Sequence, residues 1–517
     1  MLVHHYVEYY ARNNPERPCV TQAASSWSYQ KMDQCSNQLA NGLLSLGVSR
    51  GQRIAILGEN SPEHYLMFLA ASKIGAVAVP LNYRLAPAEV AYIINDAEAK
   101  MMLVLEGMET TLEAMRDSLP TDLTVVTQAA SHDLHWQAWL NDFDTVLSSQ
   151  SVDKNDAFIQ LYTSGTTGNP KGVEISHFNI LSLSHMNQIG MPNRPNAGSA
   201  GIVCAPLFHI GGAGSVISGM TGGQNALLHK AFEPAPLLDD LEKYPVSSLF
   251  MVPAMIMALL QMPGIEKRDF SQLKQIFYGA SPISETLLRK AIEIFKCDFT
   301  QMYGMTETTG TVVSLSPDDH RAALDGRPEL LRSCGRPSVG VQIKAVGKDG
   351  EQKPVGEIGE IWVKSDTNML AYYNLPEATA KEFTDGWVHT GDAGFIDDDG
   401  YLFLKDRVKD MVVSGGENIY PVEVENAIAK HEAVVDVAVI GVPNDRFGEA
   451  LLAFCVLQPG ASLSADELLE FCRDKLAGYK IPRQLELIDE LPRNASGKVL
   501  KTVLRGPYWE GKDRAIG

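Results

Sequence analysis

Short apolar runs that alternate with helical spacing limit most strongly what this chain can fold into. Residues 29–46, 62–74 and 86–96 have helical spacing, and each is followed by an apolar run, RIAILGEN, AVAVP and KMMLVLEG in turn. Such runs are typical of buried parallel strands, whose sheet is covered by helices on both faces. The alternation therefore predicts doubly wound α/β layers over residues 1–160. A chain of 517 residues is too long to fold around a single hydrophobic core, and we expect about three to four structural units.

The sequence changes character after Ser333. Residues 339–365 contain short β runs separated by Gly, Asp-Gly and Pro turns, and Asp399 with Gly400 has the form of a hairpin turn. We therefore expect a small β unit here, a distorted barrel.

A third pattern follows the charged stretch 404–410. It consists of helical spacing over 421–431, the strand-like run VVDVAVIGV, helical spacing over 465–476 and a basic tail. The charged stretch is the predicted boundary between a domain of residues 1–406 and a small α/β domain of residues 407–517.

Charge and composition exclude several classes of protein. Lys and Arg number 44 against 63 Asp and Glu, which gives a net charge of −19 and disfavours non-specific nucleic-acid binding. No run of about 18 apolar residues predicts a transmembrane helix, and the first residues do not have the form of a signal peptide. The seven cysteines form no CxxC pair. We expect reduced thiols in a cytoplasmic protein.

The segment YTSGTTGNPKG, residues 162–172, is the strongest local signal. Gly165 and Gly168 allow the backbone to approach a ligand closely. The loop gains hydroxyl donors from Thr163, Ser164, Thr166 and Thr167, and a cation from Lys171. The backbone amides of such a loop can wrap a polyphosphate. The loop lacks the G-x4-G-K-[ST] spacing of a P-loop, and a Gly/Ser/Thr surface turn is the alternative interpretation.

With this loop, the chain resembles the adenylate-forming superfamily of acyl-CoA synthetases, luciferases and peptide-synthetase adenylation domains, most of all bacterial fatty-acyl-CoA ligases. The resemblance runs from about residue 5 to about residue 508 in the family's motif order. It implies a large N-terminal domain of two α/β subdomains plus a distorted β-barrel, with a small mobile α+β C-terminal domain. It also implies ATP, Mg²⁺ and coenzyme A as cofactors, and a small-molecule carboxylic acid as the substrate.

The resemblance assigns two further segments to the nucleotide. In the family, the turn of Gly279, Ala280 and Ser281 packs on adenine. The resemblance also assigns the segment QMYGMTE to the nucleotide. Its residues are Gln301, Met302, Tyr303, Gly304, Met305, Thr306 and Glu307. Tyr303 offers a ring for stacking on a base, and Thr306 can form a hydrogen bond with the α-phosphate. Glu307 offers a hard oxygen for Mg²⁺, and Thr163 is assigned to the same ion.

Four residues near the predicted boundary and the C-terminus complete this expectation. Asp392 would accept hydrogen bonds from the ribose hydroxyls, and Arg407 matches the family's ribose- and phosphate-contacting arginine. Lys409 falls at the family's domain hinge, where many members have Asp. Lys498, in the loop PRNASGK, would bridge the carboxylate and the α-phosphate during adenylation.

The acyl group and coenzyme A are assigned to two glycine-containing segments. Residues 206–214, PLFHIGGAG, match the acyl-pocket segment, in which His209 gates the site and the small residues leave room for an apolar tail. The predicted pocket residues are His209, Gly212, Val252, Gly279 and Gly304. The turn of Gly415, Gly416 and Glu417 would contact the pantetheine of coenzyme A in the second half-reaction.

These assignments predict a two-step ligase that forms acyl-CoA, AMP and pyrophosphate through an acyl-adenylate, with domain alternation between the steps. A medium- or long-chain fatty acid is the first choice of substrate. Other substrates remain open, namely aryl or cinnamate-type acids and small branched acids. Two other functions also remain open: an adenylation enzyme that loads a separate carrier protein, and a non-catalytic nucleotide sensor. A homodimer and a weak peripheral contact with membranes are open as well.

Overall fold

The structure is a computed structural model of the chain. It describes residues 1–129, 134–163, 169–190, 197–281, 283–407, 410–414, 417–444, 446–473, 475–494 and 498–510. The predicted loop residues 164–168, the hinge residue Lys409 and the turn residues Gly415 and Gly416 lie outside these ranges.

An eight-stranded sheet contains the alternation that the sequence predicts. In spatial order its strands are β19 (Ala371–Tyr372), β9 (Lys171–Ser176), β8 (Ala157–Thr163), β4 (Val77–Leu81), β3 (Arg53–Leu57), β5 (Met101–Val104), β6 (Thr124–Thr127) and β7 (Leu134–His135). Strands β3, β4 and β5 pair in parallel and are almost wholly buried. The helices that belong to this region are α2 (Tyr29–Ser45), α3 (Pro62–Ile74), α4 (Pro87–Asp96), α5 (Glu109–Met115) and α6 (Trp136–Asn141).

A nine-stranded sheet forms the second α/β layer. Its order is β16 (Arg336–Pro337), β15 (Gly310–Leu315), β14 (Asp298–Met305), β13 (Gln275–Gly279), β12 (Val246–Met251), β10 (Ala200–Val203), β11 (Asn225–Leu228), β1 (Pro18–Gln22) and β2 (Ser25–Ser28). The helices of this region are α1 (Val3–Asn13), α7 (His177–Gly190), α8 (Ile210–Gly222), α9 (Pro234–Lys243), α10 (Pro253–Leu260), α11 (Glu285–Phe295) and α12 (Pro317–Leu324). Strands β10 to β14 pair in parallel, so their carboxyl ends meet at one edge.

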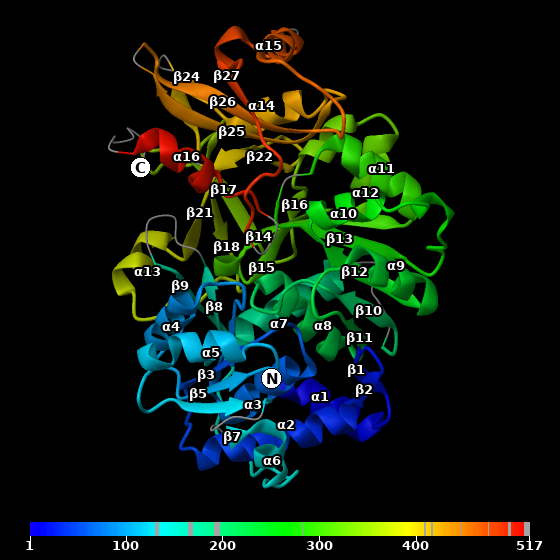
Figure 1. Cartoon of the computed structure of the whole chain (residues 1–517), viewed down its shortest axis with the longest axis vertical. Coiled ribbons are helices and arrows are strands. Elements are labelled where there is room, and N and C mark those ends of the chain that lie inside the picture. Colours follow the sequence, from blue (N-terminus) through cyan, green and yellow to red (C-terminus); the bar gives the residue numbers. More distant parts are fainter. Residues whose placement is uncertain are drawn as a thin grey trace.

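The expected distorted barrel is a curled five-stranded sheet. Its strands are β17 (Gln342–Val346), β18 (Gly359–Lys364), β21 (Trp387–Ile396), β20 (Phe383–Thr384) and β22 (Leu402–Arg407), with α13 (Pro376–Glu382) before β20. The predicted hairpin turn connects β21 to β22, and Gly400 has a φ of 81° there. In Figure 1 this sheet lies between the two large sheets and the C-terminal part of the chain.

The C-terminal part has its own sheet of β24 (Glu417–Ile419), β23 (Val412–Ser414), β26 (Gly448–Leu457), β25 (Val434–Asn444) and β27 (Gln484–Leu487). Its helices are α14 (Pro421–Ile428), α15 (Ala465–Arg473) and α16 (Lys501–Trp509). The predicted fold class is thus confirmed: two large α/β layers, a curled sheet and a small C-terminal unit. The boundary after residue 406 stays a prediction, and β22 continues through Arg407.

Two expectations drawn from composition can be followed in the structure. Each of the seven cysteines has a free thiol. Among the helices that the structure describes, none has the length and apolar character that a membrane crossing requires.

Candidate active site

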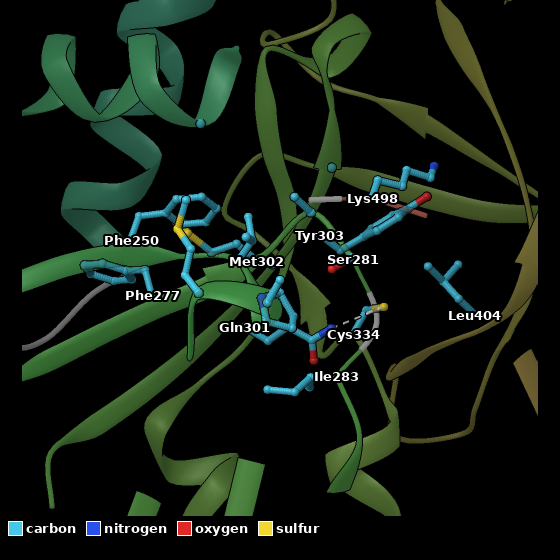
Figure 2. Close-up of a pocket in the computed structure, with 18 of the residues that line it drawn as sticks. Phe250, Phe277, Ser281, Ile283, Gln301, Met302, Tyr303, Cys334, Leu404 and Lys498 are labelled. Carbon is cyan, nitrogen blue, oxygen red and sulfur yellow. Dashed lines mark hydrogen bonds between the residues drawn. The ribbon is translucent and has the colours of Figure 1, made fainter. Parts of the chain in front are cut away.

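A cavity of about 2160 Å³ lies at the carboxyl ends of β12, β13 and β14. In open α/β sheets this edge is where ligands bind. The lining comes from all parts of the fold, including Thr163 and Lys171 from the eight-stranded sheet, Asp392 from the curled sheet and Lys498 from the C-terminal part. Figure 2 shows Phe250 and Phe277 on one side of this cavity. Tyr303 and Lys498 lie together on the other side.

Two glycines of the predicted nucleotide segments are required by their backbone neighbours. A Cβ atom on Gly279 would lie 2.1 Å from the carbonyl oxygen of Met302, and one on Gly304 would lie 1.8 Å from that of Gly310. Next to the first glycine, Ala280 has a φ of 66°, in the left-handed region that a non-glycine residue rarely adopts. The turn and the adjacent strand β14 are therefore packed tightly where they border the cavity, together with Ser281.

Tyr303 and Asp392 meet although they belong to different sheets. The Tyr303 hydroxyl donates a hydrogen bond of 2.7 Å to Oδ2 of Asp392, whose side chain is buried. Burial and the charge of Asp392 raise the pKa of Tyr303 well above its ordinary value, so that the hydroxyl stays a donor. The backbone of Asp392 pairs with that of Arg407 across β21 and β22. Three residues assigned to the nucleotide are thus neighbours in space.

The opposite end of the nucleotide segment is held by Tyr372. Its hydroxyl donates a hydrogen bond of 2.9 Å to Oε1 of Glu307, which is buried. The ammonium of Lys171 lies 4.6 Å from the centroid of the Tyr372 ring, and Lys171 pairs with Thr163 across β8 and β9. Tyr372 belongs to the two-residue strand β19, which pairs with β9, and the sequence analysis missed it.

A second carboxylate that the sequence analysis missed stands beside this group. Glu382, at the end of α13, lines the cavity and interacts with both Tyr372 and Lys171. Burial, and after it the charge of Glu307, raises the pKa of Glu382 to about 7. Carboxylates grouped in this way form an environment that favours a cation.

Lys498 borders the cavity, and its backbone is held by Asn494. Its backbone N–H donates to Oδ1 of Asn494 at 2.9 Å, and its carbonyl accepts from the N–H of Asn494 at 2.9 Å. In Figure 2 its side chain lies above Tyr303 and Ser281. The remaining predicted residues of this segment also border the cavity, namely Gln301, Met302, Met305 and Thr306.

One face of α8 supplies a wall of small side chains. The cavity is bordered by Gly211, Gly214, Ser215, Ser218 and Gly219. Their spacing of three to four residues places them on one side of the helix. Val252 borders the cavity as well, and Phe250 would lie 3.2 Å from a Cβ atom on Gly211.

Gly212 and His209 stand at the start of α8. Gly212 borders the cavity, but a Cβ atom there would lie 2.1 Å from the carbonyl oxygen of Pro206, so the helix start itself requires this glycine. Nε2 of His209 is buried and has no hydrogen-bond partner in the part of the chain that the structure describes. Burial, with a smaller contribution from Arg84, lowers the pKa of His209 to about 4, so the imidazole is neutral at pH 7. Its role as a gate stays a prediction.

Known sequences and structures agree with this arrangement. The sequence pattern of AMP-binding enzymes matches residues 7–373, and the pattern of the AMP-binding enzyme C-terminal domain matches residues 423–498. The chain belongs to the family of AMP-binding enzymes. The resemblance inferred from the loop of residues 162–172 is thereby confirmed.

Three proteins similar to this AMP-binding enzyme cover nearly its whole length. The fatty acid–[acyl-carrier-protein] ligase ScoC of Streptomyces coeruleorubidus is 34% identical over 98% of this chain and 96% of its own. The feruloyl-CoA synthase of an Amycolatopsis species is 36% identical over 96% of each chain. The ATP-bound structure of MatB from Rhodopseudomonas palustris superposes with a TM-score of 0.89 at 29% identity, over 98% of this chain and 99% of that one.

This AMP-binding enzyme presents oxygen ligands where the predicted Mg²⁺ would bind. Glu307 holds a buried carboxylate against Tyr372, and Thr163, which pairs with Lys171 across β8 and β9, also borders the cavity. Hard oxygen donors beside a nucleotide's phosphates are what Mg²⁺ prefers, so these residues fit the ion. Glu417, which was predicted to contact coenzyme A, is exposed at the start of β24 and does not border the cavity.

Proposed function

We propose that this AMP-binding enzyme is an ATP-dependent acid–CoA ligase whose acid is a medium- or long-chain fatty acid. The small-residue face of α8 is the observation that supports this substrate. From Gly211 to Gly219 the helix rises about 12 Å, and no residue of α8 is charged. Such a wall leaves space along the helix for an elongated apolar tail. It does not enclose a pocket for one compact group.

In the first step, the carboxylate oxygen attacks the α-phosphorus of ATP, an acyl–phosphate bond forms and pyrophosphate leaves. Lys498 would bind the carboxylate and an α-phosphate oxygen as the charge develops. Tyr303 would orient Asp392 toward the ribose hydroxyls. Mg²⁺ held by Glu307 and Thr163 would neutralise phosphate charge.

In the second step, the thiol of coenzyme A loses its proton and attacks the acyl carbon, and AMP leaves. The side of the cavity that Lys498 occupies in this structure must be vacated for that attack, so we expect the C-terminal part to rotate about Lys409 and bring Gly415, Gly416 and Glu417 to the acyl group. Glu417 lies outside the cavity in this structure, which is the position we expect for it during the first step.

Two alternatives have a specific observation in their favour. The similarity to a feruloyl-CoA synthase keeps an aryl acid open, and the similarity to ScoC keeps a separate carrier protein open as the acceptor. A cytoplasmic location, a homodimer and a weak peripheral membrane contact remain predictions from the sequence.

The test is AMP release with Mg·ATP and coenzyme A over acids from acetate to palmitate, with benzoate and ferulate added. Turnover that increases with chain length supports the proposal. Turnover confined to the aryl acids replaces the substrate but keeps the reaction. Pyrophosphate exchange without a CoA-dependent product indicates a carrier protein as the acceptor.

Gly219→Leu tests the direction of the acyl channel. Its Cβ atom would be 3.6 Å from Gln224, an ordinary contact, so the larger side chain extends into the space along α8. We expect kcat/KM for palmitate to fall about tenfold or more, with the value for butyrate unchanged. Gly214→Leu, nearer to His209, is expected to exclude acids of intermediate length too. Equal losses for palmitate and butyrate would contradict a channel along this face.

A further inference from the structure

Glu382 borders the cavity but has no part in the steps described above. It is the last residue of α13, and its carboxylate is half-buried. Around it stand Tyr372, Glu307, Lys171 and Glu360. This carboxylate either stabilises the fold or binds a ligand in the cavity.

The position of α13 is fixed by the same strand that positions Tyr372. The hydroxyl of Thr379 accepts a hydrogen bond of 3.0 Å from the N–H of Tyr372 and donates one of 3.0 Å to the carbonyl of Leu375. Glu382 follows Thr379 by three residues, and residues at this spacing share a helix face. The contact that ties α13 to β19 therefore also places Glu382 beside Tyr372.

The carboxylates that act on Glu382 outnumber the ammonium groups that act on it. Glu307, Glu360 and Glu382 contribute three carboxylates, and Lys171 is the ammonium that acts on Glu382. Partly buried like charges repel one another strongly. A divalent cation bound between Glu382 and Glu307, which Tyr372 holds, would relieve this repulsion.

We propose that Glu382 is a second carboxylate of the metal·ATP site, so that Glu307 and Glu382 hold the divalent ion from two elements, with Tyr372 keeping Glu307 in place. Mg²⁺ is commonly bound by one or two carboxylates together with substrate phosphates and waters. The inference rests on the proposed function for the location of the nucleotide phosphates. It adds a residue from α13 to a site otherwise built from the residues that directly follow β14 and from the end of β8.

The test measures metal binding directly, with Mn²⁺ in place of Mg²⁺. Free Mn²⁺ is followed by electron paramagnetic resonance as it is titrated into enzyme with the non-hydrolysable α,β-methylene ATP, without acid or coenzyme A. Glu382→Gln is expected to weaken Mn²⁺ binding about tenfold or more, the range for loss of a metal-supporting group. Glu377→Gln, an exposed change on the same helix, is the matched control and is expected to leave the affinity unchanged.

A second measurement separates binding from a purely structural role. The metal-free Tm of Glu382→Gln is expected to equal or exceed that of the original protein, because the change removes repulsion from Glu307. A lower metal-free Tm with unchanged Mn²⁺ affinity would overturn the proposal and identify Glu382 as a structural partner of Lys171.

Glu307→Gln distinguishes this inference from the function on which it rests. If Glu307→Gln weakens Mn²⁺ binding and Glu382→Gln does not, the assignment of Glu382 as a second metal-binding carboxylate is wrong. The proposed function is then unaffected. If both variants bind Mn²⁺ as the original protein does, the metal site has been placed wrongly altogether.

Discussion

Lys498→Ala is expected to slow acyl-adenylate formation by roughly 10²–10³-fold, the loss typical when one preorganised group that binds developing charge is removed. The side chain lies over the cavity beside Tyr303, and the Lys498 backbone makes two hydrogen bonds to Asn494. Alanine keeps these two hydrogen bonds and removes the ammonium. The measurement is pyrophosphate release at saturating ATP and acid.

The second half-reaction is the internal control for this variant. Synthetic acyl-adenylate and coenzyme A should give acyl-CoA at a rate close to that of the original protein, because Lys498 acts in the first step. Lys480→Ala, another lysine of the C-terminal part whose ammonium pairs with Glu423, should leave both rates nearly unchanged. Equal slowing of the two half-reactions by Lys498→Ala would show that the lysine has a general structural role.

Gly304→Ala is expected to cost about 3 kcal/mol of stability or more, at the upper end of the range for overpacking. The added methyl group would lie 1.8 Å from the carbonyl oxygen of Gly310. That oxygen belongs to backbone held in the pairing of β14 with β15, so neither partner can rotate away. Any accommodation must move the strand that carries Tyr303 and leads into Thr306. We therefore expect a lower Tm together with weaker ATP binding.

Gly506→Ala is the matched control for that change. This glycine lies in α16, and a Cβ atom there would meet no atom within 4 Å beyond its chain neighbours and its own helix backbone. Alanine favours a helix over glycine, but Pro507 follows and disfavours a helical residue with a Cβ atom before it, so the Tm should be nearly unchanged. A Gly304→Ala variant with the original Tm and ATP affinity would mean that β14 and β15 separate at little cost.

Local patterns predicted the individual elements well. The expected helix over residues 62–74 matches α3, which has Pro62 in its first turn and ends at Gly75 with a φ of 72°. These two residues fix a helix from within the sequence itself. The apolar run KMMLVLEG likewise contains β5.

Long-range pairing could not be predicted in this way. Nothing in the run PCVTQ indicates that β1 leaves the N-terminal region and pairs with β11 in the other large sheet. The two-residue strand β19 has no periodicity to detect, although it places Tyr372 against Glu307. Such contacts depend on which edge is available after the rest of the chain has packed.

The contrast between local patterns and long-range contacts also explains which residues of the site the sequence predicted and which it did not. Motifs rich in Gly, Thr and charged residues identified Thr163, Lys171, Glu307, Asp392 and Lys498, and all five border one cavity. Glu382 stands in an ordinary helix whose charged residues look solvated, so only its packing distinguishes it. Sequence reasoning therefore found the residues with a local pattern and missed those defined by their neighbours.

The pairing of β1 with β11 also affects how the chain is made. Val20 is matched with Ala226, so the partner of the N-terminal strand leaves the ribosome long after the strand itself. At about 5–20 residues per second, that interval lasts roughly 10–40 s. Through this time β1 and β2 have no sheet to join, while the parallel core of β3, β4 and β5 can already form. The first residues to be synthesised are thus among the last to reach their final place.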